Sequence, residues 1–336
     1  MDASTERIES VKDHPNADRL DLVEVLGYQC VTEKGLYSAG DIICYIRTDT
    51  VLPEEEWTEG YRKYAPKRVK AVRLRYFWSE GILVPLEFIQ DKFDFGTGLT
   101  KLEGFLNIIG SDISEIIGVK HYEPPIPQDL TAKGGLPYSI PKTDEKRAEE
   151  KKGRLPLGEK VDISLKIDGQ SSTFFYNLEE DYFGVTGRSM EYKEDTVNNY
   201  TQNAKKYDIE NKLRAYCQEH GVSLALRGEQ YGAGIQGSEN NPHSKENLNL
   251  AIFSVYNITN ACYENKDSDL YFENVAAELQ IPTVPIVERD VVLTQELIDK
   301  YAKELKKLNG KMFEGVVVNH SSGTFKIINK NYDSKK

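Results

Sequence analysis

The sequence has few cysteines and lacks any hydrophobic run long enough to cross a membrane. The four cysteines are far apart and form no CxxC pair. A disulfide-stabilised scaffold and a structural zinc site are therefore poorly supported, and a reducing compartment is expected. No apolar run approaches the roughly 20 residues that a bilayer span needs, and the polar first ten residues are not typical of a secretory signal. These absences predict an intracellular protein, cytoplasmic or nuclear, without a membrane partner.

Basic residues are also fewer than acidic ones, with 43 Lys and Arg against 54 Asp and Glu, which gives a net charge of −11. A protein that coats nucleic acid through bulk charge is therefore excluded, but a local basic surface is not. Residues 62–75 contain seven basic residues and no acidic one, and Tyr76, Phe77 and Trp78 follow. Basic and aromatic side chains together suit phosphates and base faces. A solvated loop without a specific partner is the alternative.

The chain of 336 residues suggests two domains, at about 150 residues each. Its first part contains several short segments rich in aliphatic, β-branched and aromatic residues, which predict a small closed β-barrel. These segments are residues 20–25, 27–31, 42–46, 71–76 and 81–85. A cluster of prolines and glycines between residues 123 and 137 marks the domain boundary. We therefore predict domains at 1–130 and 138–336.

The second half mixes predicted strands and helices without regular alternation. A charged stretch at 143–152 has a candidate helix cap at its start. Helix composition covers 196–220, 269–280 and 294–308, with Gly221 expected just past the first helix. Predicted strands cover 161–165, 172–176, 182–186, 224–226, 250–258, 316–318 and 324–328. The fold class is therefore an all-β N-terminal barrel followed by an α+β domain with mostly antiparallel sheets.

The sharpest local pattern is Lys-x-Asp-Gly at residues 166–169, where a predicted strand ends. A nucleophilic lysine must lose a proton, and its free pKa of about 10.4 opposes that loss. A nearby cation would lower this pKa. Asp168 lies two residues beyond Lys166 and can share its face, and Gly169 permits a sharp turn close to a phosphate. Alone the pattern is weak, because a surface lysine in a turn is the commoner case.

Further polar residues recur downstream, each beside a predicted strand. They are Arg188, Glu229, the aromatic pair Phe253 and Tyr256, Glu314 and Lys326. This ordered set, together with the Lys166 pattern, resembles the motifs of the covalent nucleotidyltransferases, which are the ATP-dependent polynucleotide ligases and the capping guanylyltransferases. The likeness covers about residues 140–330. In that superfamily the last motif often reads Lys-x-Lys. Here Ile328 stands at its second position, so either Lys330 substitutes or one lysine suffices.

The resemblance implies that Lys166 attacks the α-phosphate of ATP, forms a lysyl-AMP and releases pyrophosphate. Lys326 would neutralise the α-phosphate and help to depress the pKa of Lys166. A divalent ion, Mg or Mn, is implied, with Glu314, Asp168 and Glu229 as ligands. Glu229 could instead accept a hydrogen bond from the ribose.

The same resemblance suggests how the nucleotide is held. Either Phe253 or Tyr256 would stack on the adenine, with the other in the core, and the backbone at Leu165 would contact the adenine amino edge. Arg188 would bind a terminal phosphate bidentately, through two of its guanidinium nitrogens. The segment with Lys142 and Arg147 is similar to one that precedes the nucleotide pocket in some RNA ligases. These two would reach the outer phosphates, unless they simply begin an exposed helix.

The order of the two domains distinguishes among these enzymes, because here the predicted barrel comes before the domain that carries the motifs. Residues 7–20 and 40–53 resemble OB domains of tRNA-binding modules and of one RNA ligase group that has its OB domain first. This resemblance implies a monomeric, ATP-dependent RNA ligase that joins 3′-hydroxyl and 5′-phosphate ends in RNA repair. A nicked duplex, a broken stem and a single strand remain open as substrates. The RNA-binding residues would be Lys67, Arg68, Lys70 and Arg73. The alternative is a non-catalytic tRNA- or RNA-binding OB module with a degenerate nucleotidyltransferase domain.

Overall fold

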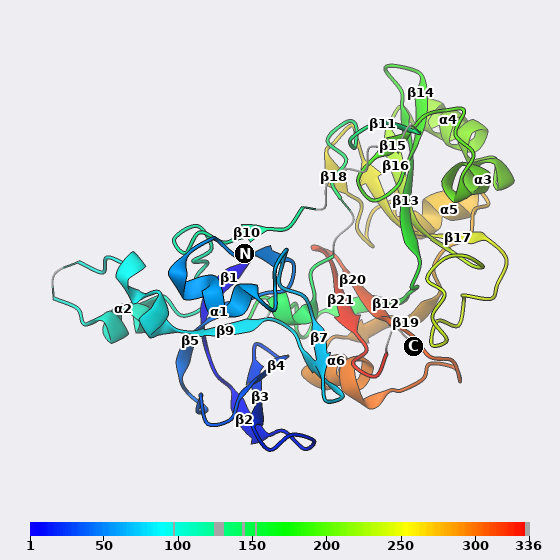
Figure 1. Ribbon diagram of the computed structural model, residues 1–336. Coiled ribbons are helices and arrows are strands. Elements are labelled where there is room, and N and C mark those ends of the chain that lie inside the picture. The colour runs from blue at the N-terminus through cyan, green and yellow to red at the C-terminus, as the bar shows by residue number, and fades with distance from the viewer. Residues whose placement is uncertain (97, 124–130, 143–144, 152, 333–336) are drawn as a thin grey trace. The chain divides into compact units, whose positions relative to one another are not determined.

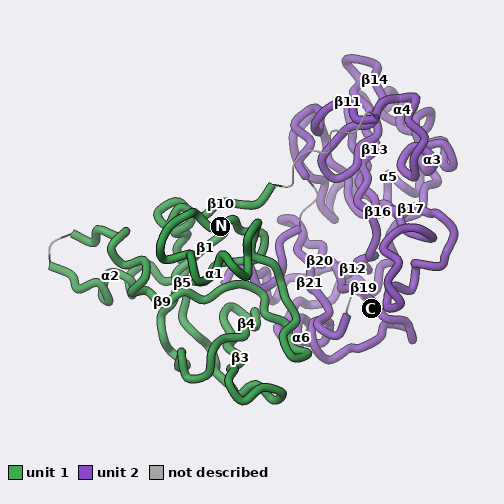
Figure 2. Tube along the Cα trace, viewed as in Figure 1, with its two compact units in different colours: residues 1–125 green, residues 126–336 purple. Residues whose placement is uncertain are grey.

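The computed structural model describes residues 1–96, 98–123, 131–142, 145–151 and 153–332. The chain forms two compact units, Met1–Pro125 and Ile126–Lys336 (Figures 1 and 2). The charged stretch predicted at 143–152 includes residues 143, 144 and 152, which lie outside the described residues. Within the described part of the chain, no helix is long and apolar enough to cross a membrane.

Unit 1 consists mainly of short antiparallel strands, as predicted. The sheet orders are β1-β5-β9, β2-β3-β4, β10-β6 and β7-β8. The strands are β1 (Ala3–Arg7), β2 (Ser10–Asp13), β3 (Leu20–Val25), β4 (Tyr28–Glu33), β5 (Ile42–Ile46), β6 (Thr50–Val51), β7 (Val72–Leu74), β8 (Phe77–Ser79), β9 (Ile82–Pro85) and β10 (Lys120–His121). Along β3, Asp21, Val23 and Val25 are buried while the residues between them are not. This period of two is that of a strand with one face on a core.

The N-terminal domain was predicted to be all-β, but the described residues of unit 1 also form two α-helices and three short 3-10 turns. The α-helices are the single turn α1 (Glu59–Arg62) and α2 (Lys101–Asn107). The side chain of Thr100 accepts a hydrogen bond from the Glu103 backbone N–H, and the Glu103 carboxylate accepts from the Thr100 N–H in return. This capping box is visible in the sequence as Thr-x-x-Glu, and it provides partners for N–H groups that the first turn leaves unpaired.

Unit 2 contains two antiparallel sheets and several helices, which confirms the predicted α+β class with antiparallel sheets. One sheet has seven strands in the order β11-β15-β14-β13-β16-β17-β18, and the other has four in the order β19-β12-β20-β21. The strands are β11 (Ala132–Gly134), β12 (Lys160–Lys166), β13 (Gln170–Asn177), β14 (Tyr182–Thr186), β15 (Glu191–Tyr192), β16 (Leu224–Tyr231), β17 (Asn249–Asn257), β18 (Cys262–Tyr263), β19 (Ile286–Val292), β20 (Gly315–His320) and β21 (Gly323–Ile328).

The helices of unit 2 are shorter than the sequence predicts. The stretch 196–220 forms α3 (Asn199–Lys206) and α4 (Ile209–His220), because Asp208 between them adopts a left-handed φ of 51°. Aspartate tolerates this conformation better than most residues, and it interrupts a helix. Gly221 ends α4 with a left-handed φ of 66°, as expected.

The other two helices are also shorter than predicted. The stretch 269–280 contains only α5 (Phe272–Glu278). The stretch 294–308 forms α6 (Gln295–Asp299) and one wider π-helical turn (Lys300–Glu304), after which Leu305 is extended.

Strand β12 organises the four-stranded sheet, since it pairs with β19 on one side and β20 on the other. Val161 and Ile163 are buried in a core that also contains Val318 and Phe325. Side chains alternate along a strand, so Lys166 is on the opposite face from Ile163. The register pairs Lys166 with Gly315, and this pairing brings the last residue of β12 next to Glu314.

Replacing Phe325 by alanine is expected to destabilise unit 2 by about 3–5 kcal/mol, because a fully buried ring leaves a cavity under β12. The measurement is urea unfolding followed by a signal from unit 2. The matched control is Val197→Ala, since Val197 is 78% exposed and its loss should change stability by no more than about 0.5 kcal/mol. Equal midpoints for the two variants would contradict this core assignment.

Candidate active site

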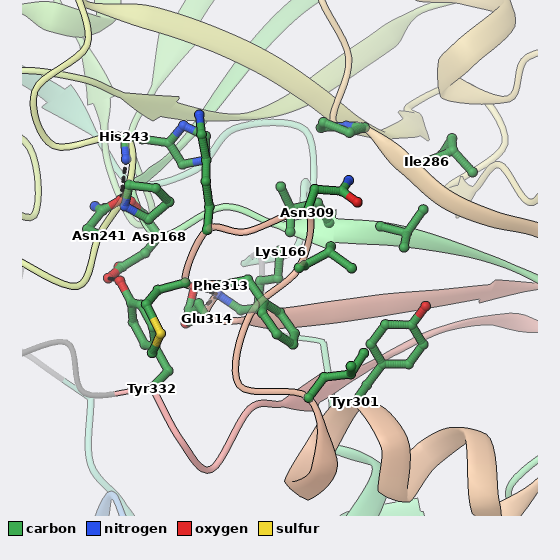
Figure 3. A pocket seen from close by; sticks show the side chains of 18 of the residues that line it. Lys166, Asp168, Asn241, His243, Ile286, Tyr301, Asn309, Phe313, Glu314 and Tyr332 are labelled. Carbon is green, nitrogen blue, oxygen red and sulfur yellow. Dashed lines mark hydrogen bonds and ion pairs between the residues drawn. The ribbon is translucent and has the colours of Figure 1, made fainter.

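The centre of the site is an ion pair at the end of β12. The amine of Lys166 donates to both carboxylate oxygens of Glu314 at 2.7 Å each (Figure 3). Both side chains are partly buried. The pair is held from both strands, because Lys166 closes β12 and Glu314 immediately precedes its partner β20. The ion pair therefore fixes the direction of the Lys166 side chain and places two negatively charged carboxylate oxygens beside its amine.

Carboxylates dominate the electrostatics around Lys166. Burial lowers the pKa of the Lys166 amine, but Glu314, Glu229 and Glu145 raise it more, so the net shift is upward. Burial raises the pKa of Glu229 to about 8, with Lys166 opposing and Glu314 reinforcing the shift. Burial likewise raises the pKa of Glu314. Without nucleotide or metal, the ion pair with Glu314 therefore stabilises the charged amine of Lys166. The depression expected from a bound cation stays a prediction.

Asp168 is held beside this pair by residues far away in the sequence. Its Oδ2 accepts a hydrogen bond of 2.7 Å from the Tyr332 hydroxyl, and its backbone carbonyl accepts one of 2.9 Å from the Asn241 amide. The Asp168 charge contributes to the raised pKa of Glu314, so the two carboxylates are coupled. Sequence reasoning missed Tyr332 and Asn241, because neither belongs to a recognisable pattern and both act over a long sequence separation.

The structure gives a steric reason for glycine at position 169 that the sequence did not suggest. A Cβ at this position would lie 2.1 Å from the backbone oxygen of Gln230 on β16. The glycine therefore allows the chain leaving β12 to pass close to the backbone of the other sheet. Gln236 donates a 3.3 Å hydrogen bond to the Gly169 carbonyl.

Lys326 lies on β21, one strand beyond Glu314, and its charge lowers the pKa of that carboxyl. Its backbone N–H donates to the Lys146 carbonyl at 2.9 Å, and Lys326 forms an isolated parallel bridge with Arg147. The structure thus brings Arg147 next to the last motif. Ile328 pairs with Gly315, which also pairs with Lys166, so the second motif position lies in the same row as the nucleophile.

The two aromatic candidates on β17 both contact core clusters. Phe253 lies at an irregularity in the pairing with β16, is partly buried and packs against the larger core. Tyr256 is buried with Phe175, and its ring lies 5.2 Å from that of Tyr263. Arg188 is exposed in the turn after β14.

Arg227 is one of the largest fully buried side chains. It lies two residues before Glu229 on β16, so the two share a face. Burial lowers the pKa of its guanidinium, and one of its nitrogens donates to the Tyr263 hydroxyl. A buried arginine on the face of Glu229 adds a positive charge to the carboxylate-rich side of this sheet.

A cavity of about 530 Å³ lies directly against the ion pair. Its polar lining includes residues that the preceding paragraphs connect: Lys166, Glu314, Asp168, Tyr332 and Asn241 (Figure 3). It also includes His243, Glu288, Lys300, Asn309 and Lys311. Its apolar lining includes residues from β19 and from the segment before β20. Leu165 also lines this cavity, whereas Phe253 and Tyr256 are not among its lining residues.

The predicted RNA-binding residues of unit 1 fall into two groups. Lys67, Lys70 and Arg73 are exposed. Arg68 is half-buried, makes a 2.7 Å ion pair with Asp49 and lies 4.3 Å from the centre of the Tyr122 ring. Arg68 therefore has a structural role inside the unit, which the sequence did not predict.

Comparisons with known proteins agree with this geometry. The family model described as RNA ligase matches residues 159–331, and a model of an OB-fold domain matches residues 2–86. The predicted N-terminal OB domain is therefore confirmed. A search of curated proteins finds no match.

Among solved structures, the chain is similar to an RNA ligase from Naegleria gruberi. The structure of that ligase with pyrophosphate has a TM-score of 0.73 and 25% identity, over 98% of this chain and 97% of that one. A variant of it with ATP and Mn gives 0.72 and 24%, over the same shares of the two chains. The ligase model alone spans more than half of the sequence. The chain therefore belongs to the RNA ligase family and carries an OB-fold domain ahead of its ligase domain.

Proposed function

We propose that this protein is an ATP-dependent RNA ligase that joins a 3′-hydroxyl to a 5′-phosphate through a covalent lysyl-AMP. The observation that carries the proposal is the ion pair of Lys166 with both oxygens of Glu314 against a cavity. A buried, charge-coupled lysine next to a pocket is the arrangement expected of a nucleophile held for group transfer.

In the first step the neutral amine of Lys166 attacks the α-phosphorus of ATP. The charged amine first gives one proton to solvent. As the neutral amine attacks, the N–P bond forms, the bond from the α-phosphorus to the oxygen that bridges to the β-phosphate breaks, pyrophosphate leaves with that electron pair, and the nitrogen loses a second proton to solvent. The raised pKa of Lys166 means that its contact with Glu314 must first open. Lys326, whose charge already acts on Glu314, would then offset the negative charge of the α-phosphate.

We assign Glu314, Asp168 and Glu229 as the carboxylates that would hold a hydrated divalent ion, Mg or Mn. Their oxygens do not all lie within 4.8 Å of one another in this structure, so binding would require them to move together. The support is electrostatic. Burial and neighbouring carboxylates raise the pKa values of Glu229 and Glu314. A bound cation would offset the repulsion between these carboxylates. Such an ion, when bound, would supply charge neutralisation at the α-phosphate. Glu229 could serve the ribose hydroxyl instead. The Naegleria gruberi ligase structures with ATP and Mn and with AMP and Mn support both ligands.

The other nucleotide contacts are assigned as the motifs suggest. Arg188, Lys142 and Arg147 would bind the phosphates, and the backbone of Leu165 would face the adenine. Of the two aromatic candidates, Phe253 is the more exposed and is our choice for stacking on the base.

In the second step a 5′-phosphate oxygen of the RNA attacks the α-phosphorus, and the P–N bond breaks. Lys166 recovers its proton, and RNA-adenylate is released from the lysine. In the third step the 3′-hydroxyl attacks the 5′-phosphate, a phosphodiester forms and AMP leaves. Such sealing suits RNA repair. The alternative, a binding module with a degenerate ligase domain, is disfavoured because the ligase family model matches residues 159–331 and because Lys166, Asp168 and Glu314 line one cavity.

Replacing Lys166 by methionine should abolish covalent labelling by α-labelled ATP, because the proposal assigns the phosphoramidate bond to the Lys166 amine and methionine has no nucleophilic nitrogen. The measurement is a denaturing gel after incubation with ATP and Mn, followed by addition of a 5′-phosphorylated nicked RNA, which should discharge the label from the wild type. Lys160→Met is the matched control, since Lys160 is exposed at the start of the same strand. Full labelling of the Lys166 variant would refute the proposed nucleophile.

Glu314→Ala and Lys326→Ala should each slow adenylylation by on the order of 100-fold, since each removes a charge that acts at the α-phosphate. Thermal unfolding should stay close to wild type. Lys330→Ala tests whether Lys330 replaces the second lysine of the last motif. A near-normal rate of adenylylation would mean that Lys326 suffices, and a loss equal to that of Lys326→Ala would mean that both lysines act. Wild-type labelling by both the Glu314 and the Lys326 variants would move the active site elsewhere.

Neutralising Lys67 and Lys70 together should weaken RNA binding and reduce its dependence on salt, because phosphate contacts release counterions. Arg68→Ala should behave differently: it should lower the thermal stability of the protein, since it breaks the contacts with Asp49 and Tyr122. Binding isotherms at several salt concentrations, with thermal unfolding of both variants, measure the two effects. An unchanged salt slope for the double variant would contradict the predicted RNA surface.

A further inference from the structure

The β7–β8 hairpin of unit 1 ends in an unusual turn. Leu74 pairs with Phe77, so the loop contains only Arg75 and Tyr76, and both have positive φ, 47° and 77°. Two-residue hairpin turns with this backbone strongly prefer Asn-Gly. A bulky residue with positive φ is rare and costs free energy. The sequence therefore retains a large cation and a large aromatic side chain where smaller residues would be more stable.

The surrounding structure holds this turn in place. The ring nitrogen of His14 lies 3.3 Å from the Leu74 carbonyl, and the Asn16 amide donates to the Arg75 carbonyl at 3.2 Å. The His14 ring also meets the edge of Phe77 at 5.0 Å. The segment that resembles tRNA-binding OB modules, residues 14–20, thus supplies braces for the hairpin tip.

The other hairpin strand is attached to the body of the unit. Gln29 on β4 donates to the Trp78 carbonyl at 2.8 Å, and the N–H of Val31 donates to the Ser79 hydroxyl at 3.0 Å. Strand β8 is thereby attached to β4, and β7, which Figure 1 labels, pairs with β8.

Strand β7 and the turn expose apolar and basic side chains together. Tyr76 is 77% exposed, and Val72 and Leu74, which neighbour Arg73 on either side, are 41% exposed. Lys70, Arg73 and Arg75 are also exposed. No acidic residue occurs from position 62 to 75. A matching partner must be negatively charged and must present flat apolar faces, and unpaired RNA has both properties.

We propose that the β7–β8 hairpin is an RNA-binding arm in which Tyr76 stacks on an unpaired base while Lys70, Arg73 and Arg75 contact the neighbouring phosphates. The inference rests on the proposed RNA ligase function and adds a substrate preference to it. Bases inside a duplex are already stacked and present only their edges, so a projecting tyrosine gains most from a single-stranded segment beside the break. The braced turn holds the ring ready and reduces the ordering cost of binding.

The decisive variant is Arg75→Asn with Tyr76→Gly in the full-length protein. It installs the preferred residues of this turn type, so thermal stability should stay equal or rise while both exposed side chains are lost. Tyr76→Ala and Tyr76→Trp separate stacking from charge. The control is Phe88→Ala, since Phe88 is an aromatic residue of unit 1 outside the hairpin that is 53% exposed.

Affinity is measured by fluorescence anisotropy with a single-stranded RNA and with a blunt, fully paired duplex. The Asn-Gly variant should lose about tenfold in affinity for the single strand, as expected for one stacked base, and clearly less for the duplex. Tyr76→Trp should bind nearly as the wild type does, and Phe88→Ala should be unaffected.

Wild-type affinity of the Asn-Gly variant for the single strand would overturn the proposal, as would equal losses on the two RNAs. So would a wild-type dimer that the variant abolishes without change in RNA binding, because β7 would then pair with a second copy of the chain. Adenylylation of the wild type is assayed separately. Its absence would refute the ligase function, whereas the arm is judged on RNA affinity alone.

Discussion

The contact on which the rest of the site depends is the ion pair between Lys166 and Glu314. Each partner occupies the end of a strand, and the pairing of β12 with β20 sets their separation. Burial by itself would favour the neutral amine that nucleophilic attack requires, but the surrounding carboxylates reverse that effect. The carboxylates therefore favour the protonated amine of Lys166 in this structure. Under the proposed mechanism, a cation bound by Glu314 would weaken that effect and favour the neutral amine.

The elements around the pair serve to keep its geometry. The core beneath β12 fixes the sheet, Gly169 lets the chain leave β12 close to β16, and Tyr332 anchors Asp168 from beyond the last strand. The OB-fold unit has an equivalent arrangement at its own surface, where His14 and Asn16 brace an unfavourable turn. In both units a costly local conformation is held by contacts from distant parts of the sequence, which is typical of functional sites.

Much of this could be predicted from the sequence. Strands such as β5 and β14 stand out as β-branched and aromatic runs between turn residues, and the motif resemblance joined Lys166 to Glu314 across a long separation. Other features depend on tertiary context. The left-handed Asp208 that divides α3 from α4 has no local signal, and the bond from Tyr332 to Asp168 is invisible to pattern reasoning. The raised pKa of Lys166 without a bound cation could not be predicted for a similar reason, since it follows from how many carboxylates the fold gathers there.

The claim that Glu314 holds Lys166 protonated can be tested by competitive labelling of lysines with an amine-reactive reagent, read out by peptide mass spectrometry. Wild type and Glu314→Gln, which keeps the shape and removes the charge, are compared near neutral pH without nucleotide, with exposed Lys160 as the internal reference. The account predicts that the substitution increases labelling of Lys166 relative to Lys160, because burial then dominates and lowers the pKa of the amine. Equal or lower labelling of Lys166 in the variant would contradict it.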